Sequence, residues 1–134
     1  MKYSSNKNMP INKLLDLYNS VGWTSYTNNP SKLELCIKNS LFVLSAWQDD
    51  ELVATARVVG DDESIIYIQD VLVKPEFQSN GIGKHLLDKV LKRFKHVRQK
   101  VLISDNLNKN KSFYEKCGFK NCSDLDLVAF YREY

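Results

Sequence analysis

Two glycines, Gly81 and Gly83, stand at the start of a helix-like segment in a chain that has only five glycines. They follow a run of strand-like apolar residues that ends with Val73. The backbone amides of a first helical turn have no partners inside the helix, and the helix dipole adds positive potential there. Glycine lets a backbone approach a ligand closely and permits a positive φ. This succession of strand, glycine loop and helix predicts a binding site for an anionic group such as a phosphate.

Two common phosphate-binding motifs do not match this loop. A dinucleotide-binding fingerprint would need Gly or Ala at position 86, where the sequence has Leu86. A P-loop would need Gly at position 78 and Ser or Thr after Lys84, where the sequence has Gln78 and His85. Lys84 adds a positive charge at the rim. The pattern that does fit is Q-x-x-G-x-G, formed by Gln78, Ser79, Asn80, Gly81, Ile82 and Gly83.

The hexapeptide, which follows a V-x-P ending at Val73 to Pro75, resembles the acetyl-coenzyme A loop of the GNAT family of N-acetyltransferases. A second stretch, FYEKCGF from Phe113 to Phe119, resembles the family's F-Y-E-K-L-G-F segment. The resemblance implies transfer of an acetyl group from acetyl-coenzyme A (acetyl-CoA) to a primary amine of a small molecule or protein, by direct attack in a ternary complex. It also implies a set of cofactor-binding residues: Leu72, Val73, Gln78, Ser79, Asn80, Gly81, Ile82, Gly83 and Lys84.

The resemblance assigns Tyr114 as the general acid that protonates the leaving thiolate. A phenol with a pKa of about 10 can protonate a thiolate with a pKa of about 8.5. The alternative is that Tyr114 only packs against Phe113 in the core. Family members often carry a cofactor-binding asparagine six residues before this phenylalanine. Leu107 stands there in this chain, so Asn106 and Asn108 on either side become the candidate cofactor ligands.

The acceptor amine must lose a proton, and the sequence leaves the base open. Family members place Glu or His at positions that match Tyr67 or Gln69, and this chain has neither there. Asp70 is the only carboxylate inside the strand predicted at 64–73, where it is either a base turned toward the site by a bulge or a structural hydrogen-bond acceptor. A water relay is the third alternative. Strand alternation predicts two faces: Tyr67, Gln69, Val71 and Val73 on one, and Ile68, Asp70 and Leu72 on the other.

The acceptor pocket is expected at the connection between the first two helices, residues 19–29. Trp23 and Tyr26 lie in this connection, and they either stack on an aromatic or cationic amine or close the core over the sheet. With Tyr67 and Gln69 they form the predicted substrate-side set. The resemblance also implies that a backbone amide near Leu72 or Val73 polarises the acetyl carbonyl and that this strand edge binds the pantetheine arm.

The periodicity of the chain predicts the elements that hold these residues. Helices are expected after Pro10 and after Asn29, the second with a capping box of Ser31 and Glu34. Strands at 41–48, 52–60 and 64–73 should form an antiparallel meander, followed by a helix at 82–95, a parallel strand at 100–104, a short helix within 110–119 and a final strand at 125–134. The fold class is α/β with a mixed sheet, a GNAT-like acyltransferase fold of order (β)ααβββαβαβ, in a single domain spanning 1–134.

The composition excludes several other classes of protein. The chain has 134 residues, 43% of them hydrophobic, and a net charge of +3, which is too small for a dedicated nucleic-acid surface. The sequence predicts neither a membrane span nor a secretory signal, and three cysteines, an odd count with none in a CxxC pair, favour a cytoplasmic protein without a metal site. A non-catalytic acyl-CoA-binding or regulatory module is the alternative function. A homodimer is one open oligomeric state, since family members are often dimers.

Overall fold

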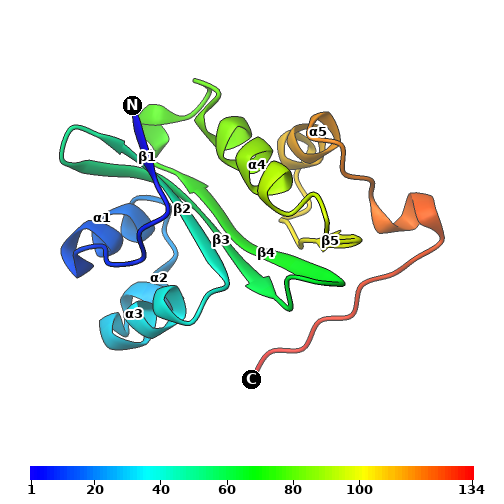
Figure 1. Ribbon diagram of the computed structural model, residues 1–134, viewed down its shortest axis with the longest axis horizontal. Helices are drawn as coiled ribbons and strands as arrows, with labels where there is room; N and C mark the ends of the chain where they lie inside the picture. The colour runs from blue at the N-terminus through cyan, green and yellow to red at the C-terminus, as the bar shows by residue number, and fades with distance from the viewer. The chain divides into compact units, whose positions relative to one another are not determined.

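The computed structural model describes residues 1–134, which divide into two compact units, Met1–Ile103 and Ser104–Tyr134. The first unit contains a five-stranded sheet of order β1-β2-β3-β4-β5 (Figure 1). Its strands are β1 (Lys2–Ser4), β2 (Phe42–Gln48), β3 (Glu51–Gly60), β4 (Ile65–Val73) and β5 (Gln99–Val101). Its α-helices are α1 (Ile11–Ser20), α2 (Thr24–Thr27), α3 (Pro30–Lys38) and α4 (Ile82–Arg93).

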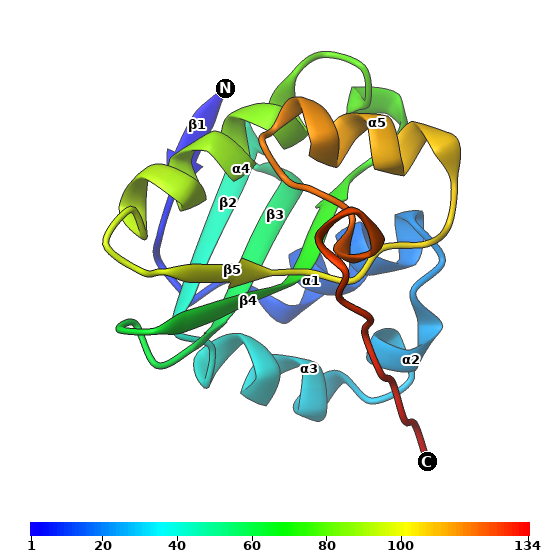
Figure 2. The ribbon, with the colours of Figure 1, turned by 90° about the vertical axis from the view of Figure 1, so that its right-hand side faces the viewer.

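Helices cover both faces of the sheet in this unit (Figure 2). On one face, α1 and α3 bury a cluster that includes Leu14, Leu17, Leu33 and Ile37 against β2, β3 and β4. On the other face lies α4, whose buried residues Ile82, Leu86, Leu87 and Val90 recur at helical spacing. The mixed sheet and the helix order confirm the predicted fold class. No helix of the chain has the length and apolar character needed to span a membrane.

The predicted antiparallel meander is confirmed. Strand β2 pairs with β3, and β3 with β4, in antiparallel register, while β5 pairs in parallel with β4. The short strand expected before the first helix is present as β1, which pairs with β2. Pairing between β4 and β5 extends only from Ile65 to Tyr67. Beyond Tyr67, the side of β4 that faces away from β3 therefore has no strand beside it in the sheet.

A bulge in β4 corrects the predicted alternation of its side chains. Arg57 of β3 pairs with Asp70, but the next residue, Val58, pairs with Ile68, so Gln69 is the extra residue. Paired residues lie on the same face of a sheet, and neighbouring residues on β3 face opposite ways. Ile68 and Asp70 therefore lie on opposite faces, and the prediction that they share a face is wrong. The residues on the Asp70 face are Tyr67, Asp70 and Leu72, because they pair with Val59, Arg57 and Thr55.

The start of α3 differs from the predicted capping box. The N-cap is Asn29, whose side chain accepts a hydrogen bond from the Lys32 amide, and Pro30 occupies the first helical position. Asn is as good an N-cap as Ser, and Pro is favoured at the first helical position because its missing amide is not needed there. These two preferences act together and start the helix before Ser31.

The second unit contains α5 (Asn108–Lys116), a 3-10 helix at Cys122–Leu125, and no strand. The predicted helix within 110–119 is confirmed by α5, which begins two residues earlier. The predicted final strand at 125–134 is wrong. Residues 127–134 have no regular secondary structure, although their sequence alternates like a strand. A strand needs a neighbour for its amides and carbonyls, and these residues are not part of the sheet.

Candidate functional site

The loop between β4 and α4 has the geometry of an anion cradle. After β4 the chain makes a 3-10 turn at Pro75–Phe77 and then bends through Ser79 and Gly81, whose φ angles are 68° and 80°. Gly81 is the N-cap of α4 and provides no side-chain cap for the first amides of the helix. Apart from its own chain neighbours, no residue has an atom within 4 Å of the position that a Cβ on Gly81 would take, so the space beside it is open. Uncapped amides beside open space suit a phosphate group.

The polar side chains of this loop have different surroundings. Gln78 donates a hydrogen bond of 2.9 Å from Nε2 to the carbonyl of Val73, which ties the loop back to the end of β4. Ser79 and Asn80 are exposed. Lys84 forms an ion pair of 2.7 Å with Asp88 one helical turn later. Its ammonium therefore has a counter-ion on its own helix, and the amides of α4 supply the electropositive field of the loop.

An ion cluster fixes the residue at which the loop leaves the sheet. The Lys74 side chain is buried, and its ammonium contacts the carboxylates of Asp16 on α1 and Glu51 on β3. The Lys74 amide also donates to the carbonyl of Val53 over 2.8 Å. Burial by itself lowers the pKa of Lys74, but the hydrogen bonds to Asp16 and Glu51 outweigh this and raise it. Lys74 therefore stays charged and anchors the first turn of the cradle.

Asp70 is the centre of a buried polar network on the opposite side of β4 from α4. Its carboxylate accepts hydrogen bonds from Arg57 Nε over 2.7 Å, from the Tyr18 hydroxyl over 2.9 Å and from the Tyr26 hydroxyl over 3.1 Å. Asp70 and Arg57 are 1% and 6% exposed, so their charges are taken out of water together. Three donors, one of them a buried cation, favour the structural role of Asp70 over that of a base.

The pKa values around Asp70 follow from the same contacts. Burial raises the pKa of Tyr18, and the Asp70 charge raises it further. Burial and Asp70 also raise the pKa of Tyr26. Burial lowers the pKa of Arg57, but attraction to Asp70 outweighs it and the net change is upward. Both phenols are therefore protonated donors and the guanidinium is charged at neutral pH.

Two of the predicted substrate-side residues contact Tyr26, Gln69 at its hydroxyl and Trp23 at its ring. Gln69, the exposed bulge residue, donates to it from Nε2 over 3.4 Å, and Arg57 Nη2 donates over 3.0 Å. The Trp23 and Tyr26 rings stack with centroids 6.2 Å apart, and both pack on the apolar cluster under α1. Closure of the core, one of the two alternatives, accounts for these rings. The pKa of Tyr67 is raised by burial, partly offset by a hydrogen bond with the Ile103 backbone.

Sequence reasoning missed Arg57 and Tyr18. Arg57 is the only charged residue after Glu51 in an otherwise buried strand, and a charged side chain in such a strand needs an opposite charge. Asp70 is the only carboxylate inside β4. One lone charged residue in each of two strands, with opposite signs, was the signal from which the Arg57–Asp70 pair could have been predicted. Tyr18 had no comparable signal, because a tyrosine at helical spacing is indistinguishable from an apolar core residue.

The remaining predicted residues lie in the second unit. Tyr114, on α5, has its ring 5.0 Å from that of Phe113 and 6.1 Å from that of Phe119. Burial raises the pKa of Tyr114, and the charge of Cys117 contributes to the increase. Asn106 and Asn108 are exposed. The phenol is therefore protonated across the neutral range, as a proton donor must be.

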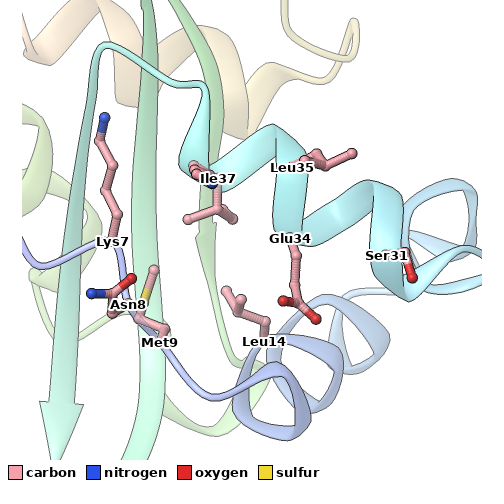
Figure 3. A pocket seen from close by; sticks show the side chains of 9 residues that line it. Lys7, Asn8, Met9, Leu14, Ser31, Glu34, Leu35 and Ile37 are labelled. Carbon is pink, nitrogen blue, oxygen red and sulfur yellow. The ribbon is translucent and has the colours of Figure 1, made fainter.

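A surface cavity of about 460 Å³ lies elsewhere in the first unit, between the segment before α1 and helix α3 (Figure 3). Leu14 and Ile37 form its apolar part, and Glu34 and Lys7 lie at its polar side. None of the predicted site residues lines this cavity.

Comparison with known proteins identifies the family. The profile of the Acetyltransferase (GNAT) family matches residues 9–119. The chain belongs to the GNAT family of acetyltransferases. A relative described as an uncharacterized N-acetyltransferase of Pyropia yezoensis is 31% identical over 120 residues, which cover 87% of this chain and 68% of the relative. Acetyl-CoA is thus the acetyl donor of this GNAT protein, as the two sequence motifs predicted.

Solved structures agree with this assignment. A GNAT acetyltransferase from Streptococcus pneumoniae TIGR4 is 30% identical, with a TM-score of 0.88 over 99% of this GNAT chain and 97% of its own. An aminoglycoside N-acetyltransferase solved in complex with CoA is 17% identical, with a TM-score of 0.75, over 98% of this chain and 93% of its own. The second likeness shows that the acyltransferase fold is shared.

Proposed function

We propose that this GNAT protein acetylates the primary amine of a small molecule, and that the β4–α4 loop binds acetyl-CoA while the Tyr26–Gln69 side of β4 receives the amine. The observation that carries the proposal is the uncapped start of α4 behind Ser79 and Gly81 at positive φ. A non-glycine residue at positive φ is strained, and such strain is found at functional loops. Bound there, acetyl-CoA supplies an activated acetyl group.

The chain's residues fit the two ends of this donor. The open amides of α4 suit its pyrophosphate, and Gln78 holds the loop against Val73. The stretch of β4 after Tyr67 has no strand beside it, which leaves backbone groups near Leu72 and Val73 for an extended arm. These two regions adjoin along the chain. The same backbone stretch is suited to donate a hydrogen bond to a carbonyl oxygen.

Proton transfer is assigned to two different routes. Tyr114 is the proposed general acid, since its pKa is raised and it therefore retains its proton. Asp70 is the remaining candidate for a base inside β4, but its oxygens already accept from Arg57, Tyr18 and Tyr26. A water relay past exposed Gln69 therefore takes the amine's proton in this proposal, and Asp70 is a positioning residue that orients Tyr26.

The acceptor is proposed as a class only. Relatives and neighbours act on different amines by their descriptions, since one is a histone acetyltransferase of Glycine max and another an aminoglycoside acetyltransferase. Exposed Gln69, with the Tyr26 hydroxyl beside it, supports a small amine, and Trp23 and Tyr67 complete the proposed substrate-side set. A cytoplasmic location, a single functional domain, a homodimer and the absence of a nucleic-acid partner remain part of this proposal.

Titration calorimetry with acetyl-CoA tests the donor site. Gly83 lies inside the first turn of α4, so Gly83→Trp adds bulk at the cradle without demanding a positive φ. Lys92→Trp adds the same bulk at an exposed position near the other end of the helix and serves as the control. We expect binding by the wild type and Lys92→Trp and loss of binding by Gly83→Trp. Equal binding by all three proteins would refute the assignment of the loop.

A thiol-release assay separates the enzyme from a non-catalytic CoA-binding module. The amine panel contains an aminoglycoside, a polyamine, an arylalkylamine and a lysine peptide. For an amine that is turned over, Tyr114→Phe should lower kcat by about 10²-fold or more, in the range of general acid catalysis, while acetyl-CoA affinity is kept. No turnover with any amine by a protein that binds acetyl-CoA would favour the module.

A further inference from the structure

Gln69 and Asp70 are successive residues of β4, yet both reach the hydroxyl of Tyr26. Gln69 Nε2 lies 3.4 Å from the hydroxyl oxygen, and Asp70 Oδ1 lies 3.1 Å from it. Successive side chains of a regular strand point to opposite faces, so this meeting depends on the bulge, in which Gln69 is the extra residue. The bulge therefore turns the amide of an exposed residue toward a buried ionic network.

The hydrogen atoms around Tyr26 follow from the chemistry of its neighbours. The ionised Asp70 carboxylate has no proton to donate, so its contact with Tyr26 uses the hydroxyl hydrogen. Arg57 has donors only, so its Nη2 donates to the Tyr26 oxygen over 3.0 Å. A hydroxyl has one hydrogen and two acceptor lone pairs, and the second lone pair of Tyr26 accepts from Gln69. Tyr26 therefore has no further hydrogen bond to offer a substrate.

The orientation of the Gln69 amide follows from these assignments. Because Tyr26 accepts from it, the NH2 group faces the hydroxyl, and a turned amide would bring two oxygens together without a hydrogen between them. The carbonyl oxygen Oε1 lies on the other side of the amide, and no residue of the first unit donates to it. Gln69 is exposed, so Oε1 is an accessible acceptor whose direction is set by Tyr26.

We propose that Gln69 Oε1 accepts a hydrogen bond from the acceptor amine and selects primary amines, and that Tyr26 is the positioning residue that sets the direction of this oxygen. This role of Gln69 rests on the proposed acetylation and names the residue that holds its amine. In the attack, the nitrogen lone pair forms the C–N bond while the C–S bond breaks. A primary amine has two N–H groups, one for Oε1 and one for the water relay that takes the proton, and the leaving thiolate takes its proton from Tyr114.

A neutral acceptor suits this step. A carboxylate at position 69 would favour the protonated ammonium, which has no lone pair for the attack, whereas an amide oxygen also binds the neutral amine. The charges of the network, Arg57 and Asp70, are paired with each other over 2.7 Å. As the nitrogen becomes positive during the attack, its N–H becomes a stronger donor. The hydrogen bond to Oε1 is therefore stronger in the transition state than in the bound substrate, which accelerates the reaction.

Acetyl transfer by Gln69→Met tests the contact. Methionine is close to glutamine in length but has no amide, and Gln48→Met makes the same change at an exposed position at the end of β2. For an amine that the wild type turns over, Gln69→Met should lower kcat/KM by about tenfold or more, as for a hydrogen bond to a charged group, with acetyl-CoA affinity unchanged. Gln48→Met should match the wild type. Equal kcat/KM for Gln69→Met and the wild type would overturn the contact while the acetylation stands.

A double-mutant cycle with Tyr26→Phe tests the positioning role. Loss of the hydroxyl removes the group that orients Gln69 and should lower kcat/KM for the amine by about threefold or more. In the Gln69→Met background the same change should have no effect on kcat/KM, because no amide remains to be oriented. An equal loss in both backgrounds would mean that Tyr26 acts through the fold alone and would overturn its positioning role.

A pair of substrates tests the selectivity. The ratio of kcat/KM for a primary amine to that for its N-methyl counterpart, which has one N–H fewer, should be smaller for Gln69→Met than for the wild type. An unchanged ratio would overturn the selection by Gln69. A wild type that binds acetyl-CoA but acetylates no amine would overturn the proposed acetylation and, with it, the role of Gln69.

Discussion

Two ionic sites, one inside β4 and one at the residue that follows it, hold this strand in different ways. At Asp70 both charges are buried, with side-chain exposures of 8% for Arg57 and 1% for Asp70. At Lys74 only the cation is buried, since Asp16 and Glu51 are 65% and 46% exposed. In the first case, removal of one partner leaves the other charge buried without a counter-ion. In the second case the carboxylates regain water, and the lysine stem is mostly aliphatic. The two sites thus predict different responses to the same kind of substitution.

The largest effect is expected from Asp70→Asn. It leaves the buried Arg57 without a counter-ion and should lower the free energy of unfolding by about 3–5 kcal/mol. Urea denaturation measures it. Asp62→Asn is the control, because Asp62 is half exposed and pairs only with His96 at the surface; its cost should stay below about 1 kcal/mol. Similar losses of unfolding free energy for the two variants would mean that the buried pair does not stabilise the fold more than the surface pair does.

An alkaline titration distinguishes the two sites further. The pKa of Tyr18 is raised in the folded protein above its ordinary 10.0, so the unfolded chain loses this proton first. The stabilisation is therefore complete below pH 10 and is lost as the pH rises above it. One such group changes the free energy of unfolding by about 1.4 kcal/mol per pH unit. Tyr18→Phe should reduce the slope above pH 10 by that amount, and an unchanged slope would contradict the role of Tyr18.

The smallest effect is expected from Lys74→Met. The substitution keeps the aliphatic stem, and Asp16 and Glu51 return to solvent, so the cost in unfolding free energy should be about 1 kcal/mol. Lys13→Met is the control, since Lys13 pairs with an Asp50 that is 95% exposed. Denaturation midpoints measured side by side test this. A loss as large as that of Asp70→Asn would contradict the difference proposed between the two ionic sites.

The features that the sequence predicted correctly are local ones. The strands β2 to β4, the helix α4 and the glycine loop each depend on periodicity or on a motif within a few residues, and all are present. The features that it missed depend on pairing between distant segments. A bulge in this strand was one of the alternatives, but its position at Gln69 follows from register against β3, and the Arg57–Asp70 pair joins two strands. The absent final strand is the same case, because alternation at 125–134 predicts a strand but does not supply its neighbour.

The α3 cap shows a second reason for error. Two start signals overlapped, Asn29 followed by Pro30 and Ser31 followed by Glu34, and each alone is a good N-terminus. Fixed φ at Pro30 favours the earlier start. The choice between them is settled by small differences in energy that a motif does not express.

The bulge at Gln69 divides β4 into two stretches whose side chains alternate between the two faces of the sheet out of phase with each other. In residues 65–68 the odd-numbered side chains lie on the face of Asp70, and in residues 70–73 the even-numbered side chains lie there. A one-residue insertion or deletion in the first stretch would move the side chains beside β5 to the opposite face of the sheet. The pairing of β4 with β3 from Asp70 to the cradle would not change. The stretch that leads into the donor loop is thus insulated from length changes upstream.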